Sequence, residues 1–483
     1  MAKKKTATRA KRARRKVVRV RFSDKQGRSI HARYDAAQTT SDNQKHWAAA
    51  DSLSAASALT AAVRLKLRTR ARYEVANNSY ATGIGLTLAN YVIGRNPRLN
   101  VRTGDDALDL MVEQEFGRWA RAVKLGQKLR TGRFARYQDG EVFIQKTTDK
   151  AVRHEVKLNP VLIETDRIAS PPIGREKDGE IEGITYDENG NPITYRVLSE
   201  HPGDSYTAGG FTLVKSAQMI HWFRADRPGQ LRGAPDITSA LGLFAELRRY
   251  RQAVIAAAET AADHAMVLQS DAPGDEEDMA EAMDTIELER RMATFLPAGY
   301  KLSQTQAEQP TTTYNLFESR ILNEIARCLN MPYNIAACNS AGYNYASGNL
   351  DHQTFWKSVG VEQQEISDHI LDDLFESWLE EARRIEGYLP ALPKGTPEHQ
   401  WFYDKREHAD PVKESTAQQM RLMNGTSTYE EEAARDGVDP ETRWNQRVKE
   451  WKRAKDAGVP YPIPQGTAAE NTGDDEDATT EEK

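Results

Sequence analysis

The residues that could take part in catalysis occur in this sequence only as incomplete motifs. Gly83 and Gly85 have the first spacing of a dinucleotide-binding loop, but the third glycine is absent and the segment has a helical pattern. Gly203-Asp-Ser-Tyr-Thr207 is similar to the turn that holds a nucleophilic serine, but its final glycine is missing. No GxxxxGK[ST] sequence occurs, which excludes a P-loop motor. The sequence therefore contains no complete motif for nucleotide or acyl chemistry.

Residues that could bind a metal are scattered along the chain. The sequence has no HExxH, EF-hand or paired CxxC motif. Cys328 and Cys338 are the only cysteines, which excludes a disulfide framework and favours a reducing compartment. Cys338 and His352 could meet, but two ordinary cysteines explain the pattern better. We expect no cofactor, no metal and no enzymatic activity, although a nuclease or processing hydrolase built from scattered acids stays an alternative.

The length and composition indicate a soluble chain of several domains. At roughly 150 residues per domain, 483 residues correspond to about three domains. Hydrophobic residues make up 39% of the chain, which is enough for several cores. The longest apolar run, Ala253–Ala258, is far shorter than the roughly 20 residues of a membrane span, and no secretory signal is recognisable. We expect an intracellularly made protein without a membrane partner.

The charge is distributed as a basic arm, an acidic body and an acidic tail. Residues 1–21 hold eleven Lys and Arg and no acid, while residues 461–483 carry −6. Because the whole chain carries −5, the body between these ends carries −10. The arm repels itself and has little to bury, so it cannot fold alone; it either binds nucleic acid or a partner, or is a solvated tail. The candidate residues for binding are Lys3, Lys4, Lys5, Arg12, Arg14, Arg15 and Lys16.

The first half of the body has helical periodicity followed by strand patterns. We predict helices within Leu53–Ile93 and one over Asp106–Leu129. Residues 140–222 are predicted to form a mostly antiparallel β region, with Asn189-Gly190 in a hairpin turn. The predicted strands are Glu141–Gln145, Val152–Leu158, Val161–Ile163, Ile181–Tyr186, Ile193–Leu198 and Phe211–Val214.

Long helices dominate the second half. Asp236 is the predicted N-cap of a helix that continues to about His264, a rod of about 42 Å. Its apolar residues are spaced 4, 3, 4, 3, 4, a pattern typical of helices that pack against other helices. A single small domain could not cover so long a stripe. The stripe consists of Leu243, Leu247, Tyr250, Val254, Ala257 and Ala261.

Several short motifs, taken in their order along the chain, resemble the lambda-type portal proteins of tailed bacteriophages. The longest is residues 218–236, which ends in Arg232-Gly-Ala-Pro-Asp236 at the junction between a strand and the long helix. The resemblance covers roughly residues 50 to 455. The other motifs are Tyr73-Glu-Val-Ala-Asn-Asn-Ser-Tyr80, Gly140-Glu-Val-Phe143, Glu182-Gly-Ile-Thr-Tyr186, Arg320-Ile-Leu-Asn-Glu-Ile-Ala-Arg327 with Met331-Pro332, Phe355-Trp356, Asp410-Pro-Val-Lys413, Gly425-Thr-Ser-Thr428 and Gly437-Val-Asp439.

This resemblance implies a helix-rich α+β portal fold with an α/β wing, a two-helix stem, a small α/β clip and a helical crown. Portals of this family are homo-oligomeric rings, typically dodecamers, at one capsid vertex. They conduct double-stranded DNA non-specifically during packaging and ejection, and dock terminase, major capsid and scaffold proteins and head–tail connector proteins. The expected location is the virion, after assembly in the host cytoplasm.

Carried over by position, the resemblance also implies a domain map. The expected parts are a basic arm (1–49), wing (50–233), first stem helix (234–264), clip (265–310), second stem helix (311–338), tunnel loop (339–349), long helix and return to the wing (350–409), crown (410–460) and acidic tail (461–483).

The predicted tunnel loop is polar and uncharged. Such a loop lets DNA slide, because each Lys or Arg on a phosphate adds affinity and friction. Two alternatives stay open: the loop could be an ordinary connector, and the protein could instead be a nucleic-acid-binding protein that acts through its basic arm. The residues expected at the tunnel are Asn339, Ser340, Tyr343, Asn344, Tyr345, Ser347 and Asn349.

Overall fold

The computed structural model divides into two compact units, Met1–Ala58 and Leu59–Lys483. The first unit contributes a short antiparallel pair, β1 (Arg21–Ser23) with β2 (Ser29–His31), and α1 (Ala55–Ala58). All that follows concerns the second unit. The structure describes residues 21–23, 29–31, 44–170, 179–204, 210–263, 267–270, 300–303, 314–390, 392, 394–404, 411–438 and 440–460.

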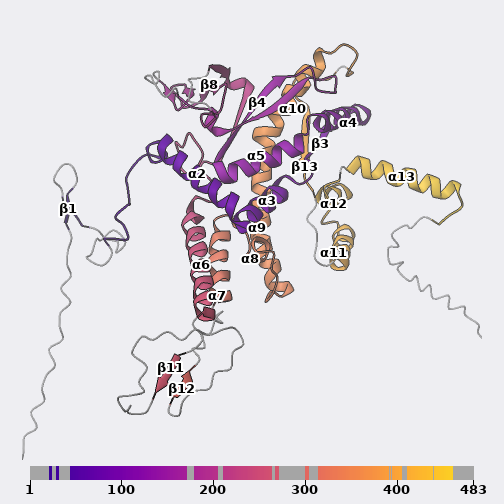
Figure 1. Cartoon of the computed structure of the whole chain (residues 1–483). Helices are drawn as coiled ribbons and strands as arrows, with labels where there is room; N and C mark the ends of the chain where they lie inside the picture. The colour runs from indigo at the N-terminus through magenta and orange to yellow at the C-terminus, as the bar shows by residue number, and fades with distance from the viewer. Residues whose placement is uncertain are drawn as a thin grey trace, which may run out of the picture. The chain divides into compact units, whose positions relative to one another are not determined.

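The main core lies between a three-stranded antiparallel sheet and a group of helices (Figure 1). The sheet order is β10-β4-β5, from Met219–Phe223, Glu141–Thr148 and Leu158–Ile163. Trp119, Phe116 and Trp378 are among the buried side chains that make the core continuous, with Phe116 5.4 Å from Trp378 between ring centroids. The helices that pack around this core are α2 (Ala61–Asn77), α3 (Ser79–Ile93), α4 (Asp106–Ala122), α5 (Leu125–Asp139), α9 (Tyr345–Ile366) and α10 (Asp372–Arg384).

A second antiparallel sheet covers the other side of β4 and buries its own small core. Its order is β6-β7-β8-β9, and Tyr195 and Val214 pack with Phe143 of β4. The predicted hairpin is confirmed: Tyr186 pairs with Pro192, and Gly190 has φ +85°. Asp187 closes the turn by accepting from the backbone nitrogens of Asn189 and Asn191. The strands are β6 (Glu180–Ile181), β7 (Ile184–Tyr186), β8 (Pro192–Leu198) and β9 (Phe211–Lys215).

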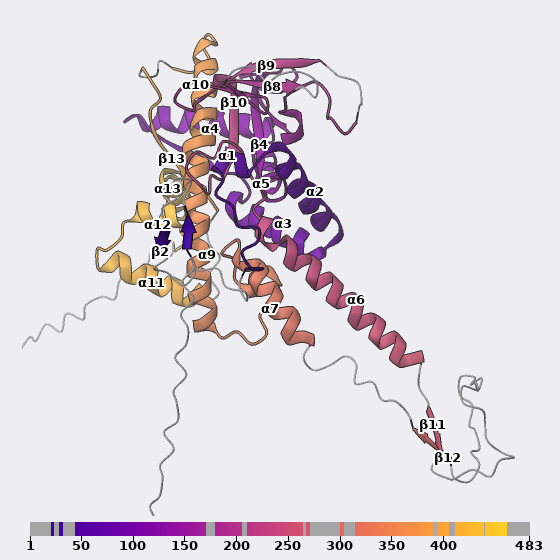
Figure 2. The same ribbon diagram turned by 90° about the vertical axis from the view of Figure 1, so that its left-hand side faces the viewer.

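Two helices, α6 (Leu241–Asp263) and α7 (Tyr314–Arg327), run side by side in opposite directions (Figures 1 and 2). The Tyr250 ring stacks on Tyr314 at 5.8 Å and lies 4.3 Å from Phe317. Between α6 and α7 in the sequence, β11 (Val267–Ser270) pairs with β12 (Tyr300–Ser303), the described part of the predicted clip.

The remaining elements complete the helix-rich α+β class that the sequence predicts. The turn of π-helix η5 (Ser367–Leu371) joins α9 to α10, and β13 (Glu398–Phe402) pairs with β3 (Arg98–Arg102). No helix within the described residues has the length and apolarity that crossing a bilayer requires. The other helical elements are α8 (Tyr333–Ala336), α11 (Pro411–Met423), α12 (Tyr429–Arg435), α13 (Pro440–Asp456), η2 (Thr165–Arg167), η3 (Ser216–Gln218) and η4 (Thr238–Ala240).

Three predicted elements before α6 are wrong. The predicted strand Ile181–Tyr186 is two antiparallel strands, β6 and β7, because Glu182 (φ 51°) and Gly183 (φ 84°) form a tight turn between them. The single helix over Asp106–Leu129 is two helices, because Lys124 adopts a left-handed conformation (φ 55°) between α4 and α5. The apolar periodicity crosses this break because both helices contribute to the same core. The predicted strand Val152–Leu158 is mostly a turn region, closed by the Asp149 carboxylate, which accepts from the nitrogen of Ala151. Only Leu158 of that segment belongs to a strand.

Three predicted boundaries around the long helices also change. Asp236 is not an N-cap, because its carboxylate is buried among arginines, and α6 begins at Leu241 after the turn η4. The long helix begins at Tyr345 rather than residue 350, because the Asn344 side chain caps it by accepting from the nitrogen of Ser347. Of the predicted second stem segment 311–338, α7 ends at Arg327 and the short helix α8 follows.

Candidate functional site

The segment that leads from the sheet into α6 is fixed by a buried carboxylate, Glu141, at the start of β4. The Arg232 guanidinium donates to it at 2.7 and 2.9 Å, and the nitrogen of Gly233 donates at 2.9 Å. Arg64 of α2 donates at 3.1 Å, and His221 of β10 lies at 2.9 Å. Four chain segments thus meet at one side chain, which we call the Glu141 hub.

The electrostatics of the Glu141 hub favour the ionised carboxylate. Burial raises the pKa of Glu141, but the Arg232 charge and the His221 contact outweigh burial and hold the pKa well below its usual value. Burial lowers the pKa of His221, against the opposing influence of Glu141. The imidazole is also held between aromatic rings, stacked on Phe143 at 4.3 Å and on Phe223 at 4.4 Å. The hub is therefore a rigid, fully enclosed ion cluster.

A second buried cluster adjoins the first, around Asp236 and Glu362. The Asp236 carboxylate is 2.8 Å from Arg133 and 3.3 Å from Arg224, and Glu362 of α9 pairs with Arg133 and lies 3.0 Å from Arg136. Burial raises the pKa of Asp236, but the three neighbouring arginine charges outweigh it and lower that pKa. The arginines of α5 thereby connect the segment before α6 to α9.

Two glycines allow the backbone to approach closely at this junction. A Cβ on Gly233 would lie 2.1 Å from the carbonyl oxygen of Gly140, and a Cβ on Gly140 would lie 2.4 Å from the carbonyl carbon of Ala234. Gly140 also has φ +92°, a conformation that L-residues rarely adopt. Larger residues at these positions would separate β4 from the segment that enters α6.

The stem residues predicted to pack are only partly brought together within one chain. Leu247 is buried, and Leu243, Tyr250 and Val254 are partly buried, but Ala257 is exposed. The side chain of Ala261 lies outside the described residues. The exposed apolar surface of the pair includes Ile255, 57% exposed, and Leu316, 65% exposed. Within the described residues, α6 and α7 thus bury only part of their apolar surface against each other.

Arg248 of α6 has an ion-pair partner in the same chain. The Nη1 atom of Arg248 donates hydrogen bonds to both carboxylate oxygens of Glu74, each at 2.7 Å. Glu74 belongs to α2, so this ion pair joins α6 to α2. The same guanidinium lies 5.3 Å from the ring of Tyr73.

The predicted tunnel loop is a compact turn that ends in a helix. Ser340, Asn339 and Asn344 are exposed, and Tyr343 is partly buried. Gly342 has φ +80°, and the nitrogen of Tyr343 donates to the carbonyl oxygen of Ser340. Of the remaining predicted residues, Ser347 and Asn349 are exposed on the first turns of α9, and the side chain of Tyr345 lies outside the described residues.

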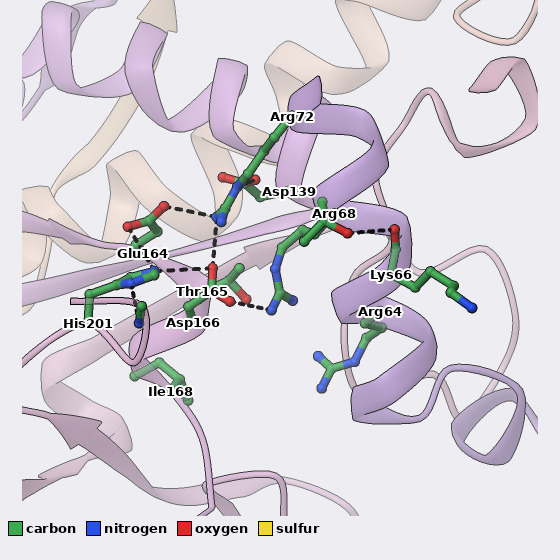
Figure 3. Close-up of polar contacts among 12 residues, drawn as sticks. Arg64, Lys66, Arg68, Arg72, Asp139, Glu164, Thr165, Asp166, Ile168 and His201 are labelled. Carbon is green, nitrogen blue, oxygen red and sulfur yellow. Dashed lines mark hydrogen bonds and ion pairs between the residues drawn. The ribbon is translucent and has the colours of Figure 1, made fainter. Parts of the chain in front are cut away.

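One group of described residues has the donor types of a metal site, Glu164, Asp166 and His201. Figure 3 shows that arginines of α2 occupy its carboxylates: Arg68 lies 2.6 Å from Asp166, and Arg72 lies 2.8 Å from Asp166 and 2.9 Å from Glu164. Two guanidinium charges disfavour a cation there. The group is an ion-pair cluster that attaches α2 to the turn η2.

Sequence reasoning missed the Glu141 hub and the Asp236 cluster. The signals were present, because Gly140-Glu141 and Arg232–Asp236 lie within motifs quoted above for their resemblance. The ion pairs themselves join residues that are 91 and 103 positions apart, so sequence spacing could not pair them. The candidate arm residues Lys3, Lys4, Lys5, Arg12, Arg14, Arg15 and Lys16 lie outside the described residues.

Both comparisons of the sequence with known proteins identify phage portal proteins as its relatives. The profile of the family described as phage portal protein, lambda family, matches residues 40–363. The chain is 26% identical to a probable portal protein of Halomonas phage phiHAP-1, covering 82% of each chain. It is 23% identical to portal protein B of Escherichia phage lambda, covering 67% of this chain and 68% of that protein.

Solved structures give weaker likenesses. A chain from the neck of an empty GTA particle, computed with C6 symmetry, has a TM-score of 0.47 and 12% identity, and the match covers 78% of this chain and 94% of that one. An HK97 family phage portal protein from Corynebacterium diphtheriae has a TM-score of 0.29 and 13% identity, over 59% and 85% of the two chains. Because both TM-scores are below 0.5, the family of this chain is established by the match to the family profile alone.

Proposed function

The chain belongs to the lambda family of phage portal proteins, and from this premise we propose that it forms a ring of about a dozen subunits at one capsid vertex. The genome would enter and leave the head through the centre of this ring. The observation that carries the proposal is the family match, which spans the three- and four-stranded sheets, α6, α7 and most of α9. The chain's own role would be geometric, and ATP hydrolysis would belong to a separate terminase.

The stem supports a ring of neighbouring subunits. The α6–α7 pair leaves Ile255 and Leu316 exposed, together with the small residues Ala253, Ala256 and Ala257. Small residues allow close approach of helices, and lateral packing in a ring would cover the stripe that one chain leaves open. The Glu141 hub and the Arg248–Glu74 pair would hold each stem at a fixed angle to its body.

The loop between α8 and α9 suits a passage for DNA. Residues 339–349 contain no charged side chain, and the described exposed residues offer amides and hydroxyls. Such groups contact a duplex without the counterion release that makes Lys and Arg bind tightly. We infer that this loop lines the narrow part of the channel. Terminase, capsid and scaffold proteins and the head–tail connector would bind elsewhere on the ring, first in the host cytoplasm and then in the virion.

A packaging assay with a charged loop tests this proposal. The Ser340→Lys variant places an ammonium group on an exposed position of the loop in every subunit of the ring. We expect rings to form normally but DNA translocation in a reconstituted packaging reaction to slow severalfold, because each bound phosphate adds friction. Ser340→Ala is the matched control and should package like the wild type. Normal packaging by the lysine variant would contradict the assignment of the loop.

A further inference from the structure

Two exposed helical faces of the second unit carry complementary charges. The basic face lies on α2 and consists of Val63, Lys66, Arg70 and Tyr73, spaced 3, 4 and 3 residues apart. The acidic face lies on α9, η5 and α10 and consists of Val361, Glu365, Asp368 and Glu376. Each face combines exposed apolar surface with charge: Tyr73 is 54% exposed and Val361 56% exposed. The acidic face begins after the exposed Lys357, and between residues 361 and 376 it has no Lys or Arg.

The basic face points away from the body of its own chain. The buried side of α2 is formed by Arg64, Arg68 and Ala71, which turn toward the core and the ion clusters. In Figure 3 the Lys66 side chain extends away from the cluster that contains Arg68 and Arg72. Among the described residues, Lys66 and Arg70 have no ion-pair partner. Their charges are therefore available to another molecule.

The acidic face is similarly free along most of its length. Asp368 accepts from Gln364 at 2.7 Å, whereas Glu365 and Glu376 have no ion pair within the described residues. The four residues share the exposed side of these helices, whereas Ile366, Ile370 and Leu374 are buried on the other side. The face ends where Arg384 lies 3.6 Å from Glu380.

The two faces lie on opposite sides of the unit. The helix α3 contacts both α2 and α9, so it lies between them. Figure 2 shows α2 on one side of α3 and α5 and shows α9 and α10 on the other. A closed ring needs this arrangement, because each subunit presents one surface to the neighbour before it and a different surface to the neighbour after it.

We propose that the basic face of α2 docks on the acidic face of α9–α10 of a second copy of this chain, and that this contact repeats around the ring. The occupant is a second copy because the two surfaces match in charge and in apolar content and lie on opposite sides. This inference rests on the proposed ring and specifies which surfaces form it. Charge complementarity also orients the subunits head to tail, since two basic faces or two acidic faces repel.

Reversing the charges on each face tests the contact. The first variant is Lys66→Glu with Arg70→Glu, and the second is Glu365→Lys with Glu376→Lys. All four side chains are exposed, so we expect both variants to keep the wild-type urea unfolding midpoint. Each variant alone should lose ring assembly by about tenfold or more in native mass measurements, because like charges then meet at every interface.

Mixing the two variants gives the sharper result. In a one-to-one mixture, the acidic α2 face of the first variant meets the basic α9–α10 face of the second, and the wild-type faces meet at the next interface. We expect even-numbered, alternating rings to reappear. The control, Arg121→Glu with Lys150→Glu, reverses two exposed charges on α4 and on the turn after β4 and should assemble normally.

The outcomes separate this inference from the proposed function. If the wild type forms rings and the reversal variants form them equally well, or if mixing folded variants restores nothing, the two faces are not the interface. If the wild type forms no ring, the proposed function itself fails.

Discussion

Glu141 is the carboxylate around which the buried charges before α6 gather. Its carboxylate accepts hydrogen bonds from Arg232, from the nitrogen of Gly233 and from Arg64, and it is fully buried. Removing one partner of a buried ion pair is costly because the other charges stay buried without compensation. Removal of the Glu141 carboxylate should therefore destabilise the folded state, because the arginines of the hub would stay buried without a counter-charge.

Glu141→Gln should lower the free energy of unfolding by about 3–5 kcal/mol, because Arg232 and Arg64 lose their buried counter-charge. The measurement is urea unfolding followed by tryptophan fluorescence, which reports on the buried Trp119, Trp222 and Trp378. Glu164→Gln is the matched control, since Glu164 pairs with Arg72 at the surface, where a pair contributes about 1 kcal/mol or less. Equal effects of the two changes would contradict the role of the hub.

His221 should make stability depend on pH below neutrality. Because burial lowers the pKa of His221 from its ordinary value of 6.5, the unfolded chain binds the proton first as the pH falls. This contribution to stability is present above pH 6.5 and is lost as the pH falls toward the folded-state pKa. In the wild type, the free energy of unfolding should begin to decrease near pH 6.5.

The His221→Asn variant should lack that contribution, so its free energy of unfolding should decrease less than that of the wild type as the pH falls below 6.5. The pKa of His154 is also lowered, chiefly by burial, so part of the slope should stay. Below about pH 4.5 a further loss should appear in both proteins, because the pKa of Glu141 is held below its usual value of 4.5. Urea midpoints between pH 4 and 8 provide the measurement, and identical slopes in both proteins would refute this account.

At the scale of elements, the entry into α6 depends on close backbone contact. Gly233→Ala would place a Cβ 2.1 Å from the Gly140 carbonyl oxygen, so β4 and the following segment must move apart. We expect a destabilisation of roughly 1–3 kcal/mol, measured as a shift of the urea midpoint. Gly242→Ala is the control, because no atom lies within 4 Å of its Cβ and the helix should gain about 0.5–1 kcal/mol. A stable Gly233→Ala protein would show that the close approach is unimportant.

Elements whose signals are local could be predicted from the sequence. The Asn189-Gly190 turn follows from residues that tolerate positive φ. The helix α6 was predictable because its apolar stripe is long and regular.

Elements set by distant contacts could not be predicted. The break at Lys124 lies where Gly126 packs against the carbonyl oxygen of Arg95, 31 residues earlier in the sequence. The role of Asp236 depends on Arg133 and Arg224, so local sequence made it resemble an N-cap. The sequence predicts residues 339–349 only as a polar segment. Local sequence allows α9 to begin either after Asn344 or near residue 350, and the Asn344–Ser347 capping contact selects the earlier start.

At the scale of the whole molecule, the central claim is that these chains stand side by side around an opening. The stem leaves apolar residues exposed, and α2 and α9–α10 present opposite charges on opposite sides. In an isolated chain the apolar residues are exposed to water and the charged faces have no partner subunit. In a closed ring the neighbouring subunits would cover the apolar residues and pair the charged faces. Family membership and surface chemistry therefore support the same assembly.

The most direct test is the mass of the purified, full-length chain under native conditions, together with negative-stain images of the same sample. The account predicts a single species of about a dozen subunits, seen end-on as rings with a central opening. Raising the salt concentration should shift this species toward monomers, because charged faces contribute to the contact. A monomer that persists at every protein and salt concentration, with no ring in the images, would contradict the account.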